Sequence, residues 1–185
     1  MRRTRDRAFT LIEALIISVI VGILAVLAVV AYRRWILNSY MAEAQNMVSN
    51  IRSAQDSFKA ENGGYLPVSL GLGVGSDYPA ATPGAFKTGW GADCDLKICA
   101  KTNSWKQLAV QPSGPVIFGY SVMADNSGKN VPPHIFVNGV DTDLDQLKGA
   151  PWYVIEADAD PKGTGQFTKL FASSGNDQIF INNEQ

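Results

Sequence analysis

The feature that most constrains the fold of this chain is an apolar segment near its N-terminus. Residues 14–31 carry no charge, and Ser18 is their only polar side chain. At 1.5 Å per residue, a helix of this length reaches about 27 Å, which is close to the thickness of the hydrocarbon core of a bilayer. The sequence therefore predicts a membrane-spanning helix within residues 9–32.

The length of this segment argues against a cleaved secretory signal, whose apolar region usually has about 7 to 15 residues. Helix-favouring sequence also continues beyond it, in YRRWILNSYMAEAQ. Glu13 interrupts the start of the run, and an ionisable group there costs about 1 to 3 kcal/mol, depending on depth. Glu13 is therefore a candidate functional residue. The alternative is that it lies in the headgroup region.

A short motif surrounds Glu13. An Arg-rich leader precedes the sequence AFTLIE at residues 8–13, and GILA follows at residues 22–25. These residues resemble the processing site of type IV prepilins and the related pseudopilins. In that family a membrane peptidase cuts before the Phe and methylates the new amine, which pairs with the glutamate of a neighbouring subunit. The resemblance implies a cleaved leader over residues 1–8, a methylated Phe9 and an assembly role for Glu13.

Two positions depart from the usual pattern of that family. Ala8 stands before the cleavage point, where the family usually has Gly. Val30 stands where most pilins carry a Pro, so a proline kink is not available and Gly22 is the only helix-weakening residue in the span.

Beyond the span, residues 33–62 have the pattern of an amphipathic helix. Apolar residues recur at alternating steps of four and three, at Tyr40, Ala44, Met47, Ile51, Ala54 and Phe58. Neither Gly nor Pro occurs between Ile23 and Glu61, and Asn62-Gly63-Gly64 provides a stop. We expect one continuous helix through both segments.

Residues 63–185 are expected to form a head domain. Short strands are predicted near residues 85–88, 105–110, 116–122, 135–137, 152–157, 167–172 and 178–181. Strands that follow one long helix indicate an α+β fold, in which an antiparallel sheet packs on the apolar stripe of the helix. This is the pilin-like layout that the resemblance also implies.

Charges near the span predict its orientation. The leader has four arginines, against Arg33 and Arg34 on the far side, which favours a cytoplasmic N-terminus. Cys94 and Cys99 would then lie outside the cytoplasm, where disulfides persist, and we expect them to be paired. A zinc site is the competing interpretation, but the sequence has no second pair of Cys or His for it.

Two aspartates are candidate calcium ligands. Asp158 and Asp160 begin a loop that has Gly163 at its sixth position, and some pilins and pseudopilins bind calcium in C-terminal loops. However, Lys162 and Lys169 occupy the fifth and twelfth positions of this loop, where oxygen ligands belong. We therefore expect no cofactor, with calcium at Asp158 and Asp160 as the alternative.

The sequence contains no motif that indicates an enzymatic or a nucleic-acid-binding function. His134 is the single histidine, and neither a nucleophile motif nor a phosphate-binding Gly loop occurs. The chain has 16 basic and 17 acidic residues; without residues 1–8, which hold four arginines and Asp6, 12 basic and 16 acidic residues remain. A mildly acidic protein of net charge −4 carries no nucleic-acid footprint.

The four tryptophans have two interpretations. Trp35 follows two arginines at the outer edge of the span, where an aromatic belt residue is expected. The others, Trp90, Trp105 and Trp152, are either adhesive surface residues or core residues of the head.

The resemblance implies a structural subunit of a type IV pilus, or fimbrium. The precursor would lie in the bacterial inner membrane and then join a filament in the periplasm or at the cell surface. Its partners would be other copies and other pilins, the prepilin peptidase, the inner-membrane assembly machinery and, before assembly, lipid. Two alternatives are a pseudopilin of a type II secretion system and a permanently anchored periplasmic binding domain.

Overall fold

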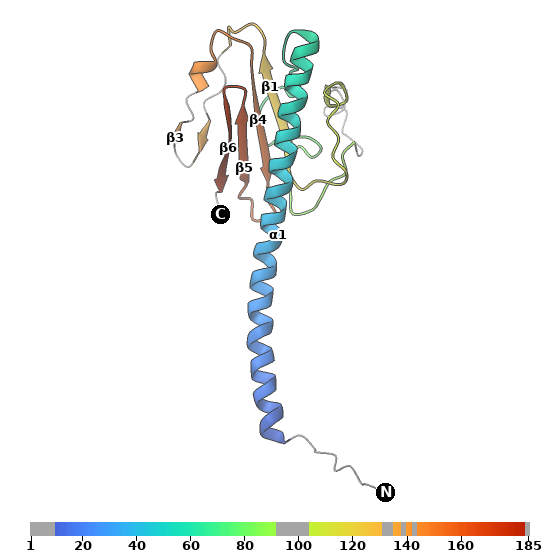
Figure 1. Ribbon diagram of the computed structural model, residues 1–185, viewed down its shortest axis with the longest axis vertical. Coiled ribbons are helices and arrows are strands. Elements are labelled where there is room, and N and C mark those ends of the chain that lie inside the picture. The colour runs from blue at the N-terminus through green and yellow to red at the C-terminus, as the bar shows by residue number, and fades with distance from the viewer. Residues whose placement is uncertain (1–9, 92–103, 131–134, 138–139, 142–143, 184–185) are drawn as a thin grey trace. The chain divides into compact units, whose positions relative to one another are not determined.

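The computed structural model describes residues 10–91, 104–130, 135–137, 140–141 and 144–183. It consists of two compact units, residues 1–39 and residues 40–185. The first helix, α1 (Leu11–Asn62), contributes to both units (Figure 1). The expected continuous helix through the apolar and amphipathic segments is therefore confirmed.

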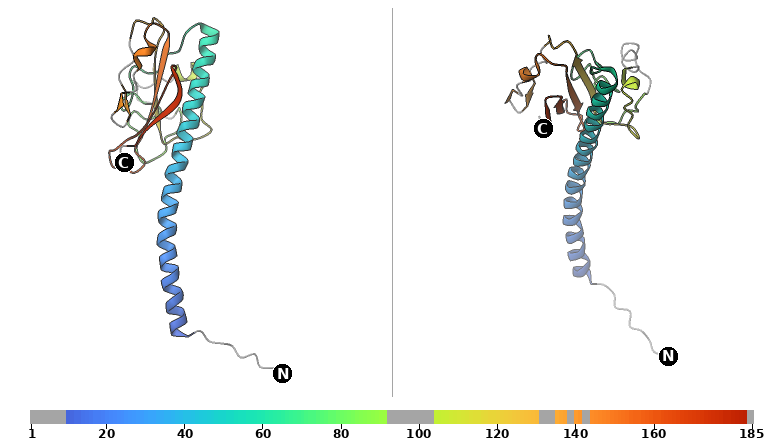
Figure 2. Two further views of the ribbon diagram at one scale, coloured as in Figure 1. Left: turned by 60° about the vertical axis from the view of Figure 1, so that its left-hand side comes forward. Right: turned by 45° about the horizontal axis from the view of Figure 1, so that its top comes forward.

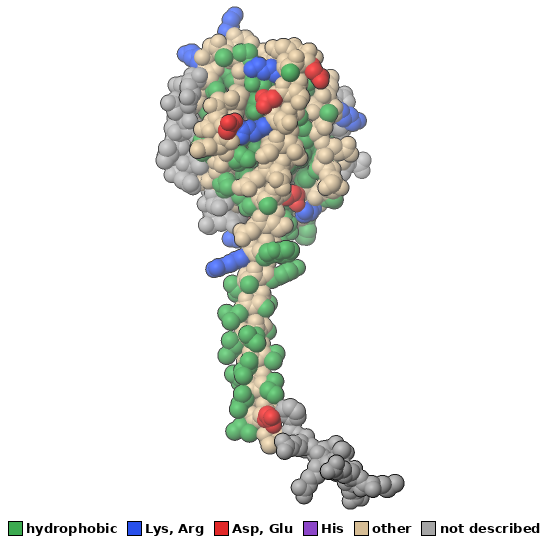
Figure 3. Space-filling model, viewed as in Figure 1, with side chains coloured by type: hydrophobic (Ala, Val, Ile, Leu, Met, Phe, Trp, Pro, Cys, Tyr) green, Lys and Arg blue, Asp and Glu red, His purple; other side chains and the backbone are tan. Residues whose placement is uncertain are grey.

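The first unit contains the apolar part of α1. Every residue from Thr10 to Trp35 is exposed, and hydrophobic side chains gather along this part of the helix (Figure 3). By length and composition, α1 is able to cross a membrane. An exposed surface of this kind requires an apolar environment, because the exposure of so large a contiguous apolar patch to water is unfavourable.

In the second unit, one stripe of α1 is buried. It consists of Ala44, Met47, Val48, Ile51 and Gln55. The expected stripe is thus partly confirmed: Tyr40, Ala54 and Phe58 are only half-buried, whereas Val48 and the polar Gln55 are fully buried. The helix ends where expected, since Gly63 adopts a φ of 78° and its N–H donates to the carbonyl of Lys59 at 2.8 Å.

A four-stranded antiparallel sheet forms the centre of this unit. Its strands are β1 (Gly119–Asp125), β4 (Trp152–Ala159), β5 (Thr168–Ser173) and β6 (Asn176–Asn183), in the order β1-β4-β5-β6. Figure 2 shows the sheet beside the C-terminal half of α1. Because side chains alternate along a strand, one face carries the main apolar core. That core includes Tyr120, Val122, Tyr153, Ile155, Ala157, Leu170 and Ala172, together with the buried stripe of α1.

The opposite face of the sheet carries a second, smaller core. Trp152, Val154 and Phe171 pack there against Ile135, Leu144 and Leu147. The last two belong to a 3₁₀ helix (Leu144–Leu147), which the sequence analysis did not predict. It follows a two-stranded ladder of β2 (Phe136–Val137) and β3 (Val140–Asp141). The expected strand near residues 135–137 is confirmed.

The segment between the helix and the sheet covers the outer edge of β1. Ser69 donates its N–H to the carbonyl of Val122 at 2.8 Å, and Tyr78 exchanges two backbone hydrogen bonds with Tyr120. Edge strands expose unpaired backbone groups, so this cover protects the sheet from pairing with other chains. The predicted strand at residues 85–88 is reduced to a single bridge between Thr88 and Val116.

One predicted strand was wrong. Residues 104–107 form a helical turn, not part of a strand over residues 105–110. The turn buries Trp105 and Leu108, which are three residues apart and so share one helical face. Ala109 ends it with a φ of 57°, in the left-handed region that ordinarily favours glycine.

Candidate functional site

The start of α1 is built around Thr10 and Glu13. Thr10 accepts the Glu13 N–H on its side-chain Oγ1 at 3.3 Å, and its carbonyl accepts the N–H of Ala14 at 3.2 Å. Thr10 is therefore the N-cap of the helix, and Glu13 occupies the third helical position. The sequence Thr-x-x-Glu is the signature of a capping box and is the signal by which this helix start is recognisable.

Glu13 is exposed at this helix terminus. Among the described residues, no basic group pairs with its carboxylate. The positive end of the helix dipole favours a negative charge there in water, by about 0.3 to 1 kcal/mol. In an apolar environment a compensating cation is needed in addition. The geometry thus leaves the carboxylate available to a partner from another molecule.

The predicted processing and disulfide residues belong to parts of the chain that the structure does not describe. Ala8 and Phe9 lie outside the described residues, and so do Cys94 and Cys99. The cleavage point, the methylated amine and the disulfide stay predictions.

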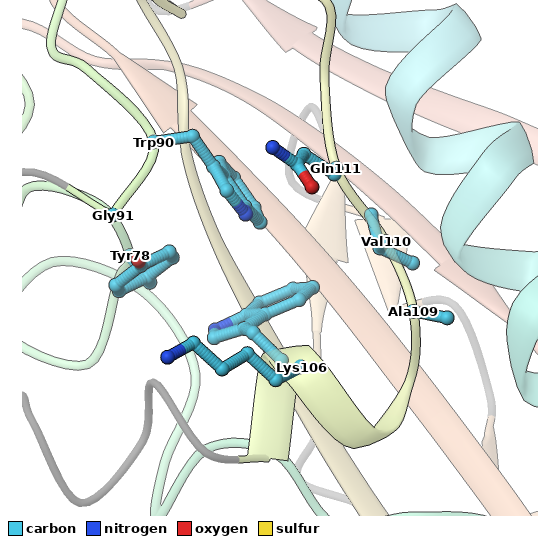
Figure 4. Close-up of a pocket in the computed structure, with 8 residues that line it drawn as sticks. Tyr78, Trp90, Gly91, Lys106, Ala109, Val110 and Gln111 are labelled. Carbon is cyan, nitrogen blue, oxygen red and sulfur yellow. The ribbon is translucent and has the colours of Figure 1, made fainter.

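Two of the tryptophans line a pocket of about 320 Å³ in the head (Figure 4). Trp90 and Trp105 pack edge to face there, with ring centroids 5.2 Å apart, and Tyr78 contacts both rings. Lys106 and Gln111 add polar groups to the lining. These aromatic residues form part of the main core, which agrees with the structural interpretation of Trp90 and Trp105.

The other two tryptophans have separate environments. Trp152 is buried in the second core, and its indole Nε1 donates to the carbonyl of Asn130 at 2.8 Å. Trp35 is 67% exposed and stacks with Tyr32, with ring centroids 6.3 Å apart. An exposed aromatic pair after the apolar run fits the expected aromatic belt.

A cluster of ionisable side chains lies beneath the loop at residues 71–77. Asp77 and Asp158 are fully buried, and Glu156 is 6% exposed. Lys169 Nζ lies 3.1 Å from Glu156 Oε1 and 3.3 Å from Asp158 Oδ1. We call Asp77, Glu156, Asp158 and Lys169 the buried acid cluster. The cluster was not predicted from the sequence, because its members come from a loop and two strands.

Burial raises the pKa of all three carboxyl groups in this cluster. The pKa of Asp77 rises to about 8, chiefly by desolvation and then by the charge of Asp158. Desolvation and the same charge raise the pKa of Glu156 to about 7, against the opposing effect of Lys169. The pKa of Asp158 is also raised by desolvation. One ammonium group cannot neutralise three buried carboxylates.

The two calcium candidates, Asp158 and Asp160, have different partners. Asp158 faces Lys169 in the buried acid cluster. Asp160 Oδ1 accepts the N–H of Thr164 at 3.0 Å, and its Oδ2 accepts the N–H of Gly165 at 2.7 Å. A calcium ion would compete with an ammonium group at one aspartate and with backbone donors at the other. The absence of a cofactor stays the prediction and calcium at these two residues its alternative, which calorimetric titration of the full chain with calcium tests.

Two carboxamide side chains that the sequence did not single out hold the chain where it leaves α1. Gln55 pairs with the backbone of Leu66, and Asn126 pairs in the same way with the backbone of Tyr65. Arg52, one turn before Gln55, donates to the carbonyls of Ser173, Asn176 and Asp177 at the turn between β5 and β6. These contacts position the helix on the sheet.

Comparison with known proteins finds a family match in the N-terminal region. Residues 3–29 match the family described as the prokaryotic N-terminal methylation motif. The chain is 31% identical over 74 residues to the Fimbrial protein EcpC of Eikenella corrodens, which covers 40% of this chain and 48% of that protein. It is 38% identical over 88 residues to the Type II secretion system core protein G of Klebsiella michiganensis, covering 46% of this chain and 60% of that protein. No solved structure gives a significant match.

The predicted resemblance to the type IV pilins and pseudopilins is therefore confirmed. The chain carries the methylation motif of these proteins, and its long apolar helix and antiparallel sheet have the predicted α+β layout. Neither of the two relatives is named as an enzyme, in agreement with the prediction of a non-enzymatic protein. The alignments span about half of each relative's length.

Proposed function

We propose that this chain, which carries a prokaryotic N-terminal methylation motif, is a structural subunit of a type IV pilus or a related filament. The observation that carries the proposal is the match of residues 3–29 to that motif, at the start of a helix that is exposed and largely apolar from its beginning to Trp35. An isolated copy needs lipid around this surface. In a filament, neighbouring helices would replace the lipid.

The precursor is inserted in the bacterial inner membrane with its N-terminus in the cytoplasm. A prepilin peptidase cleaves between Ala8 and Phe9 and methylates the new amine. Leader removal frees a positive charge one residue before the N-cap Thr10. This charge is what the Glu13 carboxylate lacks among the described residues.

Assembly follows from pairing this amine with Glu13 of an adjacent copy. An apolar helix exchanges lipid for neighbouring helices at small net cost, because both surroundings are apolar. The buried ion pair then favours one register, since a displaced helix leaves a charge unpaired in an apolar environment. Such head-to-tail contacts generate an open-ended helical filament, in the periplasm or at the cell surface. The assembly machinery of the inner membrane would supply the energy.

A second candidate is a pseudopilin of a type II secretion system. The specific observation that favours it is the 38% identity with a core protein G of such a system. Processing and helix packing would be the same in both cases. Visible surface fibres in cells that express the chain would distinguish a pilus subunit from a pseudopilin, whose filament stays in the periplasm.

The test is mass spectrometry of the mature N-terminus in protein isolated from a host with a prepilin peptidase. We expect a chain that begins with a methylated Phe9. Ala8→Gly should be processed at least as well, whereas Ala8→Leu should accumulate as precursor. Protein that still begins at Met1 would contradict the filament proposal and favour a permanently anchored periplasmic domain.

A further inference from the structure

The buried acid cluster lies on the face of the sheet that is turned away from α1. Glu156 and Asp158 alternate along β4 with Ile155 and Ala157, which belong to the main core. Lys169 is the cross-strand partner of Asp158 on β5, and Gly119 is its partner on β1. The cluster therefore occupies one continuous patch of the sheet, and the loop at residues 71–77 covers it.

Two glycines allow the loop to approach this patch closely. Gly73 is buried with a φ of 75°, and its N–H donates to Ser121 Oγ at 3.0 Å. A Cβ added to Gly73 would lie 3.0 Å from Glu156 Oε1, and one added to Gly119 would lie 2.6 Å from the Cβ of Asp77. The backbone of the loop thus seals the carboxylates from water.

The charges under the loop do not balance. Three carboxyl groups face one ammonium group, that of Lys169. Among the described residues, neither carboxylate oxygen of Asp77 has a hydrogen-bond partner, although the side chain is fully buried. An ionised carboxylate in this state is strongly unfavourable, whereas a protonated one is able to donate a hydrogen bond to a neighbouring carboxylate.

We propose that a proton held between Asp77 and Asp158 fastens the 71–77 loop to the sheet, and that the loop loosens when this proton dissociates. The groups that face Asp77 are Asp158 and Glu156 on β4 and the hydroxyl of Ser121 on β1. Lys169 on β5 lies against Asp158 and Glu156. Protonation makes Asp77 a donor to Asp158, while Lys169 neutralises the charge that remains on Asp158. Dissociation leaves two adjacent buried carboxylates, and opening of the loop to water relieves their repulsion.

The direction of the pH effect follows from the raised pKa of Asp77, about 8 against 3.8 for the unperturbed group. Between these values the folded state holds a proton that the unfolded state has lost. The stabilisation is therefore complete below about pH 4 and is lost as the pH rises to about 8. This is the reverse of ordinary acid denaturation, in which stability is lost as the pH falls.

A metal ion is the competing way to balance the charges. The ammonium group of Lys169 already lies against two of the three carboxylates. The described residues contain no group of three acidic, histidine or cysteine side chains arranged to hold a metal. The structure therefore favours a proton.

The test is urea unfolding of the full chain in detergent micelles, followed by tryptophan fluorescence between pH 5 and pH 8. The unfolding equilibrium constant of the wild type should increase at least tenfold per pH unit, because unfolding releases the proton of Asp77 and, below about pH 7, also that of Glu156. Asp77→Asn keeps a donor without a titrating group, so its profile should be flatter and it should be more stable than wild type at pH 8. Asp158→Asn removes the charge of the carboxylate that accepts the hydrogen bond from Asp77. It is the substitute test variant if Asp77→Asn does not fold.

Asp56→Asn is the matched control, because Asp56 is exposed on α1 and should keep the wild-type profile. Hydrogen exchange at pH 9, corrected for intrinsic rates, reports on the loop itself. Peptides that cover residues 68–80 should exchange faster in wild type than in Asp77→Asn. Parallel pH profiles for wild type and Asp77→Asn, or equal exchange of these peptides, would overturn the proposal. So would stabilisation of the wild type at pH 8 by added calcium that Asp77→Asn lacks, because a cation would then fill the cluster.

Discussion

The side chain of Gln55 on α1 forms two hydrogen bonds with the backbone of Leu66. Its Nε2 donates to the Leu66 carbonyl at 2.8 Å, and its Oε1 accepts the Leu66 N–H at 2.9 Å. Asn126, which follows β1, holds Tyr65 in the same manner at 2.7 and 2.8 Å. Two consecutive residues are thus held by carboxamides from two different parts of the chain, α1 and the segment after β1. This arrangement fixes the direction in which the chain leaves α1.

Gln55→Leu should destabilise the head because it leaves a backbone N–H and a carbonyl without their partners. An unsatisfied buried polar group costs about 1 to 3 kcal/mol, so we expect a loss of about 3 kcal/mol in the free energy of unfolding. Urea unfolding of the full chain in detergent measures it. Gln45→Leu is the control, because Gln45 is exposed on the same helix. Equal stability of the two variants would contradict the role of Gln55.

Arg52→Met should weaken the attachment of the β5–β6 turn to α1. Arg52 Nη1 donates to the Asp177 carbonyl at 2.7 Å, and Nη2 contacts the carbonyls of Ser173 and Asn176. Part of this site is open to water, so we expect a loss of about 1 to 2 kcal/mol, with faster hydrogen exchange in residues 173–180. Lys148→Met removes an exposed cation and should change neither quantity. Unchanged exchange in the Arg52 variant would show that the turn is held by the sheet alone.

Glu13→Gln should separate the two roles of this residue. Glutamine at the third helical position is still able to complete a capping box, but it has no charge for the amine of a neighbouring copy. We expect normal membrane insertion and cleavage, with filament incorporation reduced at least tenfold in sheared surface fractions. Ser18→Ala changes the other polar residue of the segment and should assemble normally. If Glu13→Gln gives the same yield of filaments as wild type, the assembly role proposed for Glu13 is wrong.

Asp160→Asn should alter stability at low pH. Hydrogen bonds from the backbone N–H groups of Gly165 and Thr164 lower the pKa of Asp160. The charged form is therefore favoured by folding, and its contribution is lost as the pH falls through the lowered pKa. Asn offers one acceptor in place of two, so this variant should be less stable than wild type at pH 7. On acidification from pH 5 to pH 2, the variant should lose less stability than wild type, which thermal unfolding measures. A variant whose stability depends on pH in the same way as wild type would contradict this prediction.

The sequence predicted the parts of the fold that repeat with a regular period. The uninterrupted helix and the strands of the sheet were recognisable because apolar residues recur along one face or alternate. The end of the helix was recognisable from a different signal, the glycines that follow Asn62. The same rule misplaced residues 105–110. There, a single helical turn buries Trp105 and Leu108 three residues apart, and so short a segment has no period to reveal it.

The polar interior could not be predicted because its residues meet only in the folded chain. Asp77 lies in a loop and faces Asp158, which is 81 positions later in the chain, and strand pairing brings Lys169 against Asp158. Gln55 was not predicted, since its partner is the backbone of Leu66, which leaves no trace in the pattern of side chains. By contrast, Glu13 was recognisable at once, because a charge within an apolar run is conspicuous in sequence alone.

The contact between Arg52 and the β5–β6 turn has a mechanical consequence. If the proposed filament is under tension, a pull on α1 reaches the head, and Arg52 passes part of that force directly to the β5–β6 hairpin. The hairpin then shares the load borne by α1. Trimming the C-terminal hairpin should therefore produce fibres that break at lower force, even where assembly itself is unaffected.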